Sequence, residues 1–274
     1  MTSLKKEILE KDIPAQEASE NNLMAQPLVV HLTELRKRLV WTVLVFSVVT
    51  IVAYCFASEI YGFLTEPLAA QGGDMPNRRL IYTGLTEAFT TYLKLSIFTA
   101  GLVTVPFVML QVWLFMAPGL YKSEKCRVLP FFLAAPVLFA CGAALCFFYV
   151  IPIAWEFFLG FEVQQPSNGL PIILEARVAE YLSLVMTLIF AFGFAFQLPV
   201  VLGLLAQFGI FRAEHLVKFR RWALLIIVIV AAILTPPDVI SQVALAIPLY
   251  CLYEISIALV RVIQRHPPSN STEV

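Results

Sequence analysis

Six long apolar runs follow one another along the chain, and short polar segments separate them. A transmembrane α-helix needs about 20 consecutive, mostly apolar residues. By this measure the sequence predicts an all-α integral membrane protein with both termini on the same side of the bilayer. The six predicted transmembrane helices lie near residues 39–57, 88–114, 128–152, 181–208, 222–234 and 239–260.

The fifth run is shorter than a bilayer requires. Residues 222–234 form about 20 Å of helix, against a hydrocarbon core of about 30 Å. The run ends at the turn TPPD, residues 235–238. Because a mismatch in length costs free energy, we expect the bilayer to thin at this short fifth span or a partner helix to dock there.

Prolines interrupt several of the runs. A proline inside a helix lacks the N–H needed for the helical hydrogen bond and produces a kink. Kinked helices leave concave surfaces between them, so the sequence predicts a concave face. The prolines concerned are Pro106, Pro136, Pro152, Pro199 and Pro248.

Basic residues are distributed unevenly between the two sides of the predicted bundle. Cytosolic loops of membrane proteins carry an excess of Lys and Arg. Only Arg78, Arg79 and Arg177 fall on one side. The other side carries Lys5, Lys6, Lys11, Arg36, Lys37, Arg38, Lys122, Lys125, Arg127, Arg212, Lys218, Arg220, Arg221, Arg261 and Arg265. We therefore expect both termini in the cytosol.

The composition supports a membrane protein. Hydrophobic residues make up 59% of the 274 residues and charged residues only 14%, whereas soluble domains average near one half and one quarter. Lys plus Arg and Asp plus Glu both total 19, so net charge does not suggest a nucleic-acid partner. We expect a disordered cytosolic extension at 1–26, a transmembrane domain at 27–265 and a disordered cytosolic tail at 266–274.

Motifs of common catalytic sites are missing from the sequence. It contains no HExxH, GxSxG, Walker A or GxGxxG pattern, which argues against zinc protease, ATPase and dinucleotide chemistry. The five cysteines are scattered without a CxxC pair, which argues against a metal site. We expect no enzyme activity, no metal and no cofactor.

Glu34 lies where a charged segment, HLTELRKRL at 31–39, enters the first apolar run. Helical spacing allows it to pair with Lys37 or Arg38, which would stabilise the helix by about 0.2–0.5 kcal/mol. Alternatively, a carboxylate at this boundary can receive a ligand's guanidinium in a bidentate pair, which lysine cannot imitate. The spacing alone leaves both interpretations open.

A second acid, Glu124, is predicted on the same cytosolic side, at the start of the third transmembrane helix. There it can stabilise the N-terminus of that helix by about 0.3–1 kcal/mol. It can also act with Glu34 as a receptor for cations. The sequence does not decide between these roles.

Further polar residues are predicted deeper in the membrane, where such groups are usually paired or functional. Gln197 can satisfy the carbonyl that Pro199 leaves without a donor. Glu254 can pair with Arg261 on the same helix face or exchange a proton, and Asp238 lies near the outer boundary. An alternative function is therefore a secondary transporter coupled through Glu254 and Asp238. Such transporters have inverted repeats around a midplane site, and no convincing repeat is present.

Five segments, in this order, resemble the TatC family, the multi-spanning receptor subunit of the twin-arginine protein translocase. They are HLTELRKRL at 31–39, FLTEPL at 63–68, QVWLFMAPGLYKSEK at 111–125, FAFGFAFQLPV at 190–200 and LTPPDVISQVALAIPLYCLYE at 234–254. The resemblance covers about residues 27–262 and includes the layout of six spans with both ends inside.

The resemblance implies a core subunit in the bacterial cytoplasmic membrane that binds twin-arginine signal peptides of folded precursors at its cytosolic face. It also implies single-span TatA and TatB partners, other copies of this chain, and export driven by the proton-motive force. The matching positions for signal-peptide binding are Glu34, Arg36, Phe115 and Glu124; those for partner docking are Thr235 and Gln242; and other functional positions are Pro67, Gln197 and Asp238. Many relatives carry a glutamate where this chain has Gln197, which favours hydrogen bonding there over a role that needs an ionisable group.

Overall fold

The computed structural model describes residues 31–71, 80–162, 175–234 and 239–265. Within these residues the chain forms helices and one isolated β-bridge, without a β-strand. The all-α prediction is confirmed for this part of the chain. The predicted terminal regions at 1–26 and 266–274, together with Thr235 and Asp238, lie outside the described residues.

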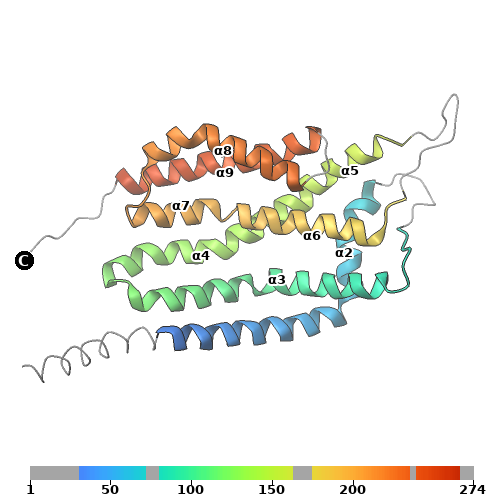
Figure 1. Ribbon diagram of the computed structural model, residues 1–274, viewed down its shortest axis with the longest axis horizontal. Helices are drawn as coiled ribbons and strands as arrows, with labels where there is room; N and C mark the ends of the chain where they lie inside the picture. The colour runs from blue at the N-terminus through green and yellow to red at the C-terminus, as the bar shows by residue number, and fades with distance from the viewer. Residues whose placement is uncertain (1–30, 72–79, 163–174, 235–238, 266–274) are drawn as a thin grey trace, which may run out of the picture.

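The helices run back and forth in one elongated bundle (Figure 1). A first helix at His31–Cys55 precedes α2 at Ala57–Gln71 and α3 at Glu87–Met116. The next elements are a 3₁₀ turn, η1, at Ala117–Gly119, α4 at Lys122–Leu145, a π-helical turn, η2, at Cys146–Val150, and α5 at Ile151–Leu159. The last four are α6 at Val178–Ala195, α7 at Leu198–Gln207, α8 at Ala213–Leu234 and α9 at Val239–Arg265.

Five of the described helical segments are long and apolar enough to cross a membrane. They are His31–Cys55, Glu87–Gly119, Lys125–Leu159, Val178–Gln207 and Gln242–Gln264. The helix α8 is not among them, because Lys218, Arg220 and Arg221 lie within it and its apolar part begins only at Trp222. Length and composition therefore support five of the six predicted spans.

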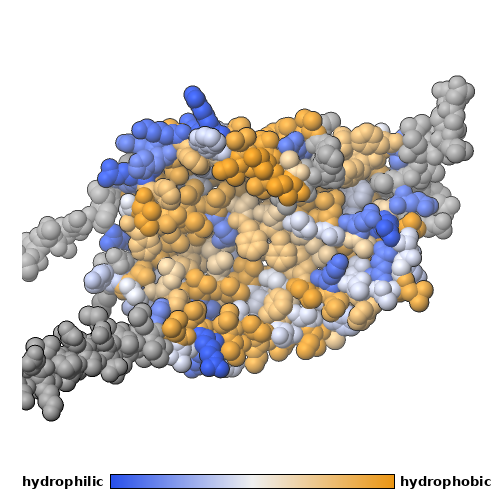
Figure 2. Space-filling model, viewed as in Figure 1, coloured by the Kyte–Doolittle hydropathy of each residue, from blue (hydrophilic) through white to orange (hydrophobic). Residues whose placement is uncertain are grey.

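The bundle has two ends that are more polar than its middle (Figure 2). The His31 end, at the left of Figure 1, contains the start of the first helix, the end of α3, the start of α4 and the end of α9. The Glu87 end, at the right, contains α2, the start of α3 and the start of α6. The described chain thus begins and ends at the His31 end.

Burial differs strongly between the first helix and the centre of the bundle. Only 6% of the apolar segment of His31–Cys55 is buried within the chain, against 44% for Val178–Gln207. In the centre, α4 packs closely on α6 because glycines remove side chains from the contact. A Cβ atom added at Gly142 would lie 2.7 Å from the carbonyl oxygen of Phe192. The first helix is consequently the most loosely attached of the five membrane-spanning segments.

No apolar run of membrane length lies between the first and second predicted spans, and there residues 57–71 form the short helix α2. This helix lies across the others at the Glu87 end (Figure 1). It is too short to register as an apolar run of membrane length. It forms because one side packs on the bundle, with Leu64 buried and the hydroxyl of Tyr181 donating to the Leu64 carbonyl at 2.6 Å.

Two prolines mark changes in the helices that the sequence predicts as continuous. The fourth span is divided, because α6 ends at Ala195 and α7 begins at Leu198 with Pro199 in its first turn. In the third span, η2 precedes α5, and Pro152 lies in the first turn of α5. Pro199 follows a break, where its missing N–H would have no helical partner, whereas Pro152 follows the π-helical turn within a helical segment that continues from Lys125 to Leu159. The other prolines predicted to produce kinks, Pro106, Pro136 and Pro248, lie inside continuous helices.

A backbone contact joins two distant segments at the Glu87 end. The N–H of Ile81 donates to the Ala176 carbonyl at 3.1 Å, and the N–H of Val178 donates to the Ile81 carbonyl at 3.0 Å. These bonds form the isolated bridge between Ile81 and Arg177. They hold the segment before α3 against the segment before α6.

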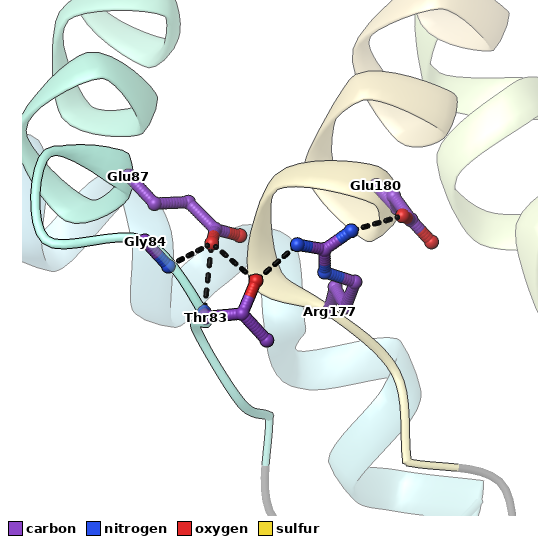
Figure 3. Close-up of polar contacts among 5 residues, drawn as sticks. All are labelled: Thr83, Gly84, Glu87, Arg177 and Glu180. Carbon is purple, nitrogen blue, oxygen red and sulfur yellow. Dashed lines mark hydrogen bonds and ion pairs between the residues drawn. The ribbon is translucent and has the colours of Figure 1, made fainter.

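Side chains reinforce this joint (Figure 3). Oε2 of Glu87 accepts the N–H of Thr83 at 2.8 Å and that of Gly84 at 3.0 Å. Arg177 donates to the hydroxyl of Thr83 and to Oε1 of Glu180, the latter at 3.1 Å. Because Glu87 is the first residue of α3, its carboxylate fixes the turn that leads into that helix.

Candidate ligand-binding site at the His31 end

Glu34 and Arg38 lie one turn apart on the first helix and form an ion pair. Nη2 of Arg38 is 2.5 Å from Oε1 of Glu34, and Nε donates to the same oxygen at 3.2 Å. The two side chains are 34% and 20% exposed. The partner of Glu34 is therefore Arg38 rather than Lys37, the other residue that helical spacing allows.

Arg38 also reaches the end of α3. Nη1 donates to Oε1 of Gln111 at 3.3 Å, and Nη2 donates to the carbonyl of Leu114 at 3.1 Å. Leu114 lies in the last turn of α3, where carbonyl groups lack helical donors and a cation is favourable. One guanidinium thus connects the first helix to α3.

Phe115 lies at the same junction. Its ring stacks on the ring of His31, with centroids 4.2 Å apart and planes inclined by 24°. Arg36 is exposed and lies two residues from Glu34, a spacing that places side chains on different sides of a helix. The structure therefore brings Glu34 and Phe115 together, with Arg36 on another side of the first helix.

Glu124 is the third residue of α4. The start of α4 lies at the His31 end of the bundle (Figure 1), so both candidate acids belong to the same end. The side chain of Glu124 is outside the described residues.

Pro67 and Gln242 lie apart from Glu34. Pro67 is inside α2, at the Glu87 end. Gln242 lies in the first turns of α9, and its Nε2 donates to the carbonyl of Val228 in α8 at 3.1 Å. The other predicted residues of this group, Thr235 and Asp238, are outside the described residues.

Gln197 makes a different contact from the one predicted. Its side chain is buried, and Nε2 donates to the carbonyl of Ala135 in α4 at 3.0 Å. The sequence suggested a bond to the carbonyl left free by Pro199. Gln197 lies in the break between α6 and α7. Its amide hydrogen bond connects this break to α4.

Glu254 is paired, but with a partner on another helix. Nη2 of Arg220 in α8 is 2.6 Å from Oε2 of Glu254, and the Tyr250 hydroxyl donates to Oε1 at 3.0 Å. The pair predicted within α9, with Arg261, is not the one formed. Because α8 packs along α9, Arg220 of α8 lies closer to Glu254 than Arg261 does, which is two turns further along α9. A compensated carboxylate gives no support to the transporter alternative.

Comparison with known proteins decides the family. The family model described as Sec-independent protein translocase protein (TatC) matches residues 30–248, most of the chain. The chain belongs to the TatC family. This membership confirms the family that the five sequence segments indicate.

Individual TatC proteins match over most of their length. The Sec-independent protein translocase protein TatC of Rickettsia prowazekii (strain Madrid E) is 49% identical over 235 residues, which cover 85% of this chain and 92% of the relative. That of Escherichia coli (strain K12) is 39% identical over 233 residues, covering 85% and 87%. A crystal structure of the twin-arginine translocase receptor TatC is 35% identical and superposes with a TM-score of 0.71, covering 86% of this chain and 100% of that one.

Membership of the TatC family settles the general role. The chain is a subunit of a Sec-independent protein translocase and a multi-pass protein of the inner membrane. It is a transport component rather than an enzyme. The likeness in fold to a solved TatC protein also agrees with the bundle described above.

Proposed function

We propose that this chain is the receptor that binds the paired arginines of twin-arginine signal peptides at its His31 end. The observation that carries the proposal is the partly exposed carboxylate of Glu34, which already holds a guanidinium at the junction of the first helix and α3. Arg38 thus occupies the position that a ligand's arginine would take. The solved relative is a twin-arginine translocase receptor, which supports the same assignment.

A signal peptide needs more than this one carboxylate. Exposed ion pairs contribute only about 0–1 kcal/mol each. Glu124, in the first turn of α4, supplies the second acid for the second arginine, and the aromatic pair of Phe115 and His31 supplies apolar contact. Exposed apolar side chains seven and fourteen residues after Glu34, Trp41 and Val48, lie on the same face of the first helix and continue that surface into the membrane for the apolar part of the peptide. Arg36, on another side of the helix, contacts a different part of the precursor.

The proposal requires the His31 end to face the cytosol, with six spans that include the short α8. The excess of Lys and Arg at this end supports the orientation. A variant that keeps only Cys126, which is exposed in α4, tests it. A membrane-impermeant thiol reagent added outside intact cells should leave Cys126 unlabelled, whereas a cysteine at the exposed Tyr82 should react. The reverse pattern would overturn the orientation.

Single-span TatA and TatB partners are proposed to dock near Thr235 and Gln242, where the short apolar part of α8 leaves the bilayer incompletely matched. Gln242 lies between α9 and α8, so a partner there would contact both helices. Pro67, which lies in α2 at the Glu87 end (Figure 1), and Asp238 are proposed as further functional positions outside the docking pair. Gln197 joins α4 to α7 and keeps the bundle in register, and the proton-motive force supplies the energy for export.

Peptide capture by the full chain in lipid nanodiscs tests the receptor function. A fluorescent peptide with two adjacent arginines should bind, and the same peptide with two lysines should bind at least tenfold more weakly, because lysine cannot form the bidentate pair. Equal binding of both peptides would contradict the assignment. Uptake of a small solute by proteoliposomes that contain only this chain would favour a transporter instead.

A further inference from the structure

The carboxylate that we assign to the ligand is occupied within the chain. Both hydrogen bonds from Arg38 to Glu34 end on one oxygen, Oε1, at 2.5 and 3.2 Å. A bidentate pair uses both oxygens of a carboxylate, one for each N–H of the guanidinium fork. An arginine of a bound peptide therefore cannot pair fully with Glu34 while Arg38 keeps both donors on Oε1.

Arg38 can leave Glu34 without losing all its partners. Its guanidinium also donates to Oε1 of Gln111 at 3.3 Å and to the carbonyl of Leu114 at 3.1 Å. Both acceptors belong to the last turns of α3 and do not depend on Glu34. Removal of a buried or half-buried charge from its partner is costly when nothing replaces that partner. Here α3 holds the displaced guanidinium, which lowers the cost of the exchange.

We propose that Arg38 is an intramolecular competitor of the ligand for Glu34, so that the empty site is self-occupied and a bound arginine displaces Arg38 toward α3. The inference rests on the proposed receptor function. It makes Arg38 a residue that sets the affinity of the site and promotes release, because the internal guanidinium returns to Glu34 when the peptide leaves.

The size of the effect follows from the fraction of molecules in which Glu34 is free. A ligand that binds only this fraction has its apparent affinity reduced in proportion. A partly exposed, hydrogen-bonded ion pair is worth about 1 kcal/mol, which corresponds to about a fivefold excess of the paired form. Release of Glu34 from Arg38 should therefore strengthen binding of the two-arginine peptide by about fivefold.

Four variants of the full chain in nanodiscs test the proposal with that peptide. Arg38→Gln should bind about fivefold more tightly than wild type. Glu34→Gln should bind more weakly, and adding Arg38→Gln to it should give no gain, because competition for Glu34 needs Glu34. Arg221→Gln makes the same change in charge at an exposed position of α8 near the same end and should leave the affinity unchanged.

Each result has a separate meaning. If wild type does not bind the peptide, or Glu34→Gln binds as tightly as wild type, the receptor function itself fails. If those two results hold and Arg38→Gln binds equally or more weakly, the competitor role is wrong. A gain that persists in the Glu34→Gln background would also overturn it, since that gain would come from reduced charge repulsion alone.

Arg38→Lys covers the case in which Arg38→Gln does not insert or fold. Lysine retains the charge, but its single ammonium group cannot donate to Oε1 of Glu34 and to α3 in the way that the forked guanidinium does. Its binding of the two-arginine peptide should be about twofold tighter than that of wild type. An affinity at or below the wild-type value would contradict the proposal.

Discussion

The two ends of the bundle are held together in different ways. At the His31 end, the guanidinium of Arg38 links the first helix to α3 through side-chain donors. At the Glu87 end, backbone hydrogen bonds of Ile81 join segments far apart in the sequence, and Glu87 fixes the adjoining turn through two further N–H groups. At the His31 end a side-chain guanidinium donates these hydrogen bonds, whereas at the Glu87 end main-chain N–H groups donate them.

This difference suggests a division of labour. Partly exposed ion pairs contribute little stability and exchange readily with a charged ligand, whereas backbone groups that lose their partners destabilise the fold. Functional contacts also tend to occur in less stable parts of a protein, and the first helix is little buried. We therefore expect changes at the His31 end to alter ligand binding, and changes at the Glu87 end to alter stability.

The largest effect is expected when both candidate acids at the His31 end lose their charge. Glu34→Gln and Glu124→Gln should each weaken binding of the two-arginine peptide about tenfold, and together about a hundredfold, because each removes a charge-assisted pair. Fluorescence anisotropy in nanodiscs measures the affinity. Glu66→Gln, an exposed acid of α2, is the matched control and should bind normally. Wild-type affinity in the double variant would remove the basis for a receptor at this end.

At the Glu87 end, Glu87→Ala should lower the free energy of unfolding, because the N–H groups of Thr83 and Gly84 lose their acceptor. Chemical unfolding in detergent measures this loss, with Glu66→Ala as the control for removing an exposed acid. Peptide affinity should stay at the wild-type value. A variant that keeps its stability but no longer binds peptide would break the proposed division between the ends.

The sequence predicts contacts within a helix better than contacts between helices. The pair of Glu34 and Arg38 follows from a spacing of four residues, which any helix brings together. Their link to Gln111 joins positions 73 residues apart, and no local pattern contains that information. For the same reason, the partner of Glu254 was expected on its own helix, although α8 supplies Arg220.

The length of the apolar runs identifies the membrane-length helices but not the points at which they are interrupted. The segment 57–71 is too short to be recognised as a span by its length, and it becomes helical by packing on the bundle. Pro199 predicts an irregularity in the helix of the fourth span. Whether the helix kinks there or a new helix begins depends on the neighbouring helix that packs against this position. Gln197 donating to Ala135 in α4 provides that tertiary contact. The roles of the nine candidate site residues stay predictions.

Gln197 lies between the two ends and should affect stability more than binding. Gln197→Leu keeps a similar volume but removes the donor to the Ala135 carbonyl, so the free energy of unfolding should fall by about 1 kcal/mol. Gln207→Leu, an amide at the end of α7, is the matched control for making the chain more apolar. Unfolding in detergent and peptide binding should be measured on the same samples. A normal stability with impaired binding would instead assign Gln197 to the ligand site.

The smallest effect is expected for Arg177→Gln, which separates the side-chain part of the Glu87 end from its backbone part. The side chains of Arg177 and Glu180 are 46% and 71% exposed, so their pair should contribute about 0.5 kcal/mol or less. The bridge to Ile81 uses main-chain atoms that the substitution leaves in place. The free energy of unfolding of Arg177→Gln should therefore stay close to the wild-type value and well above that of Glu87→Ala. A loss as large as that of Glu87→Ala would mean that a guanidinium holds this end too, and the physical difference between the two ends would disappear.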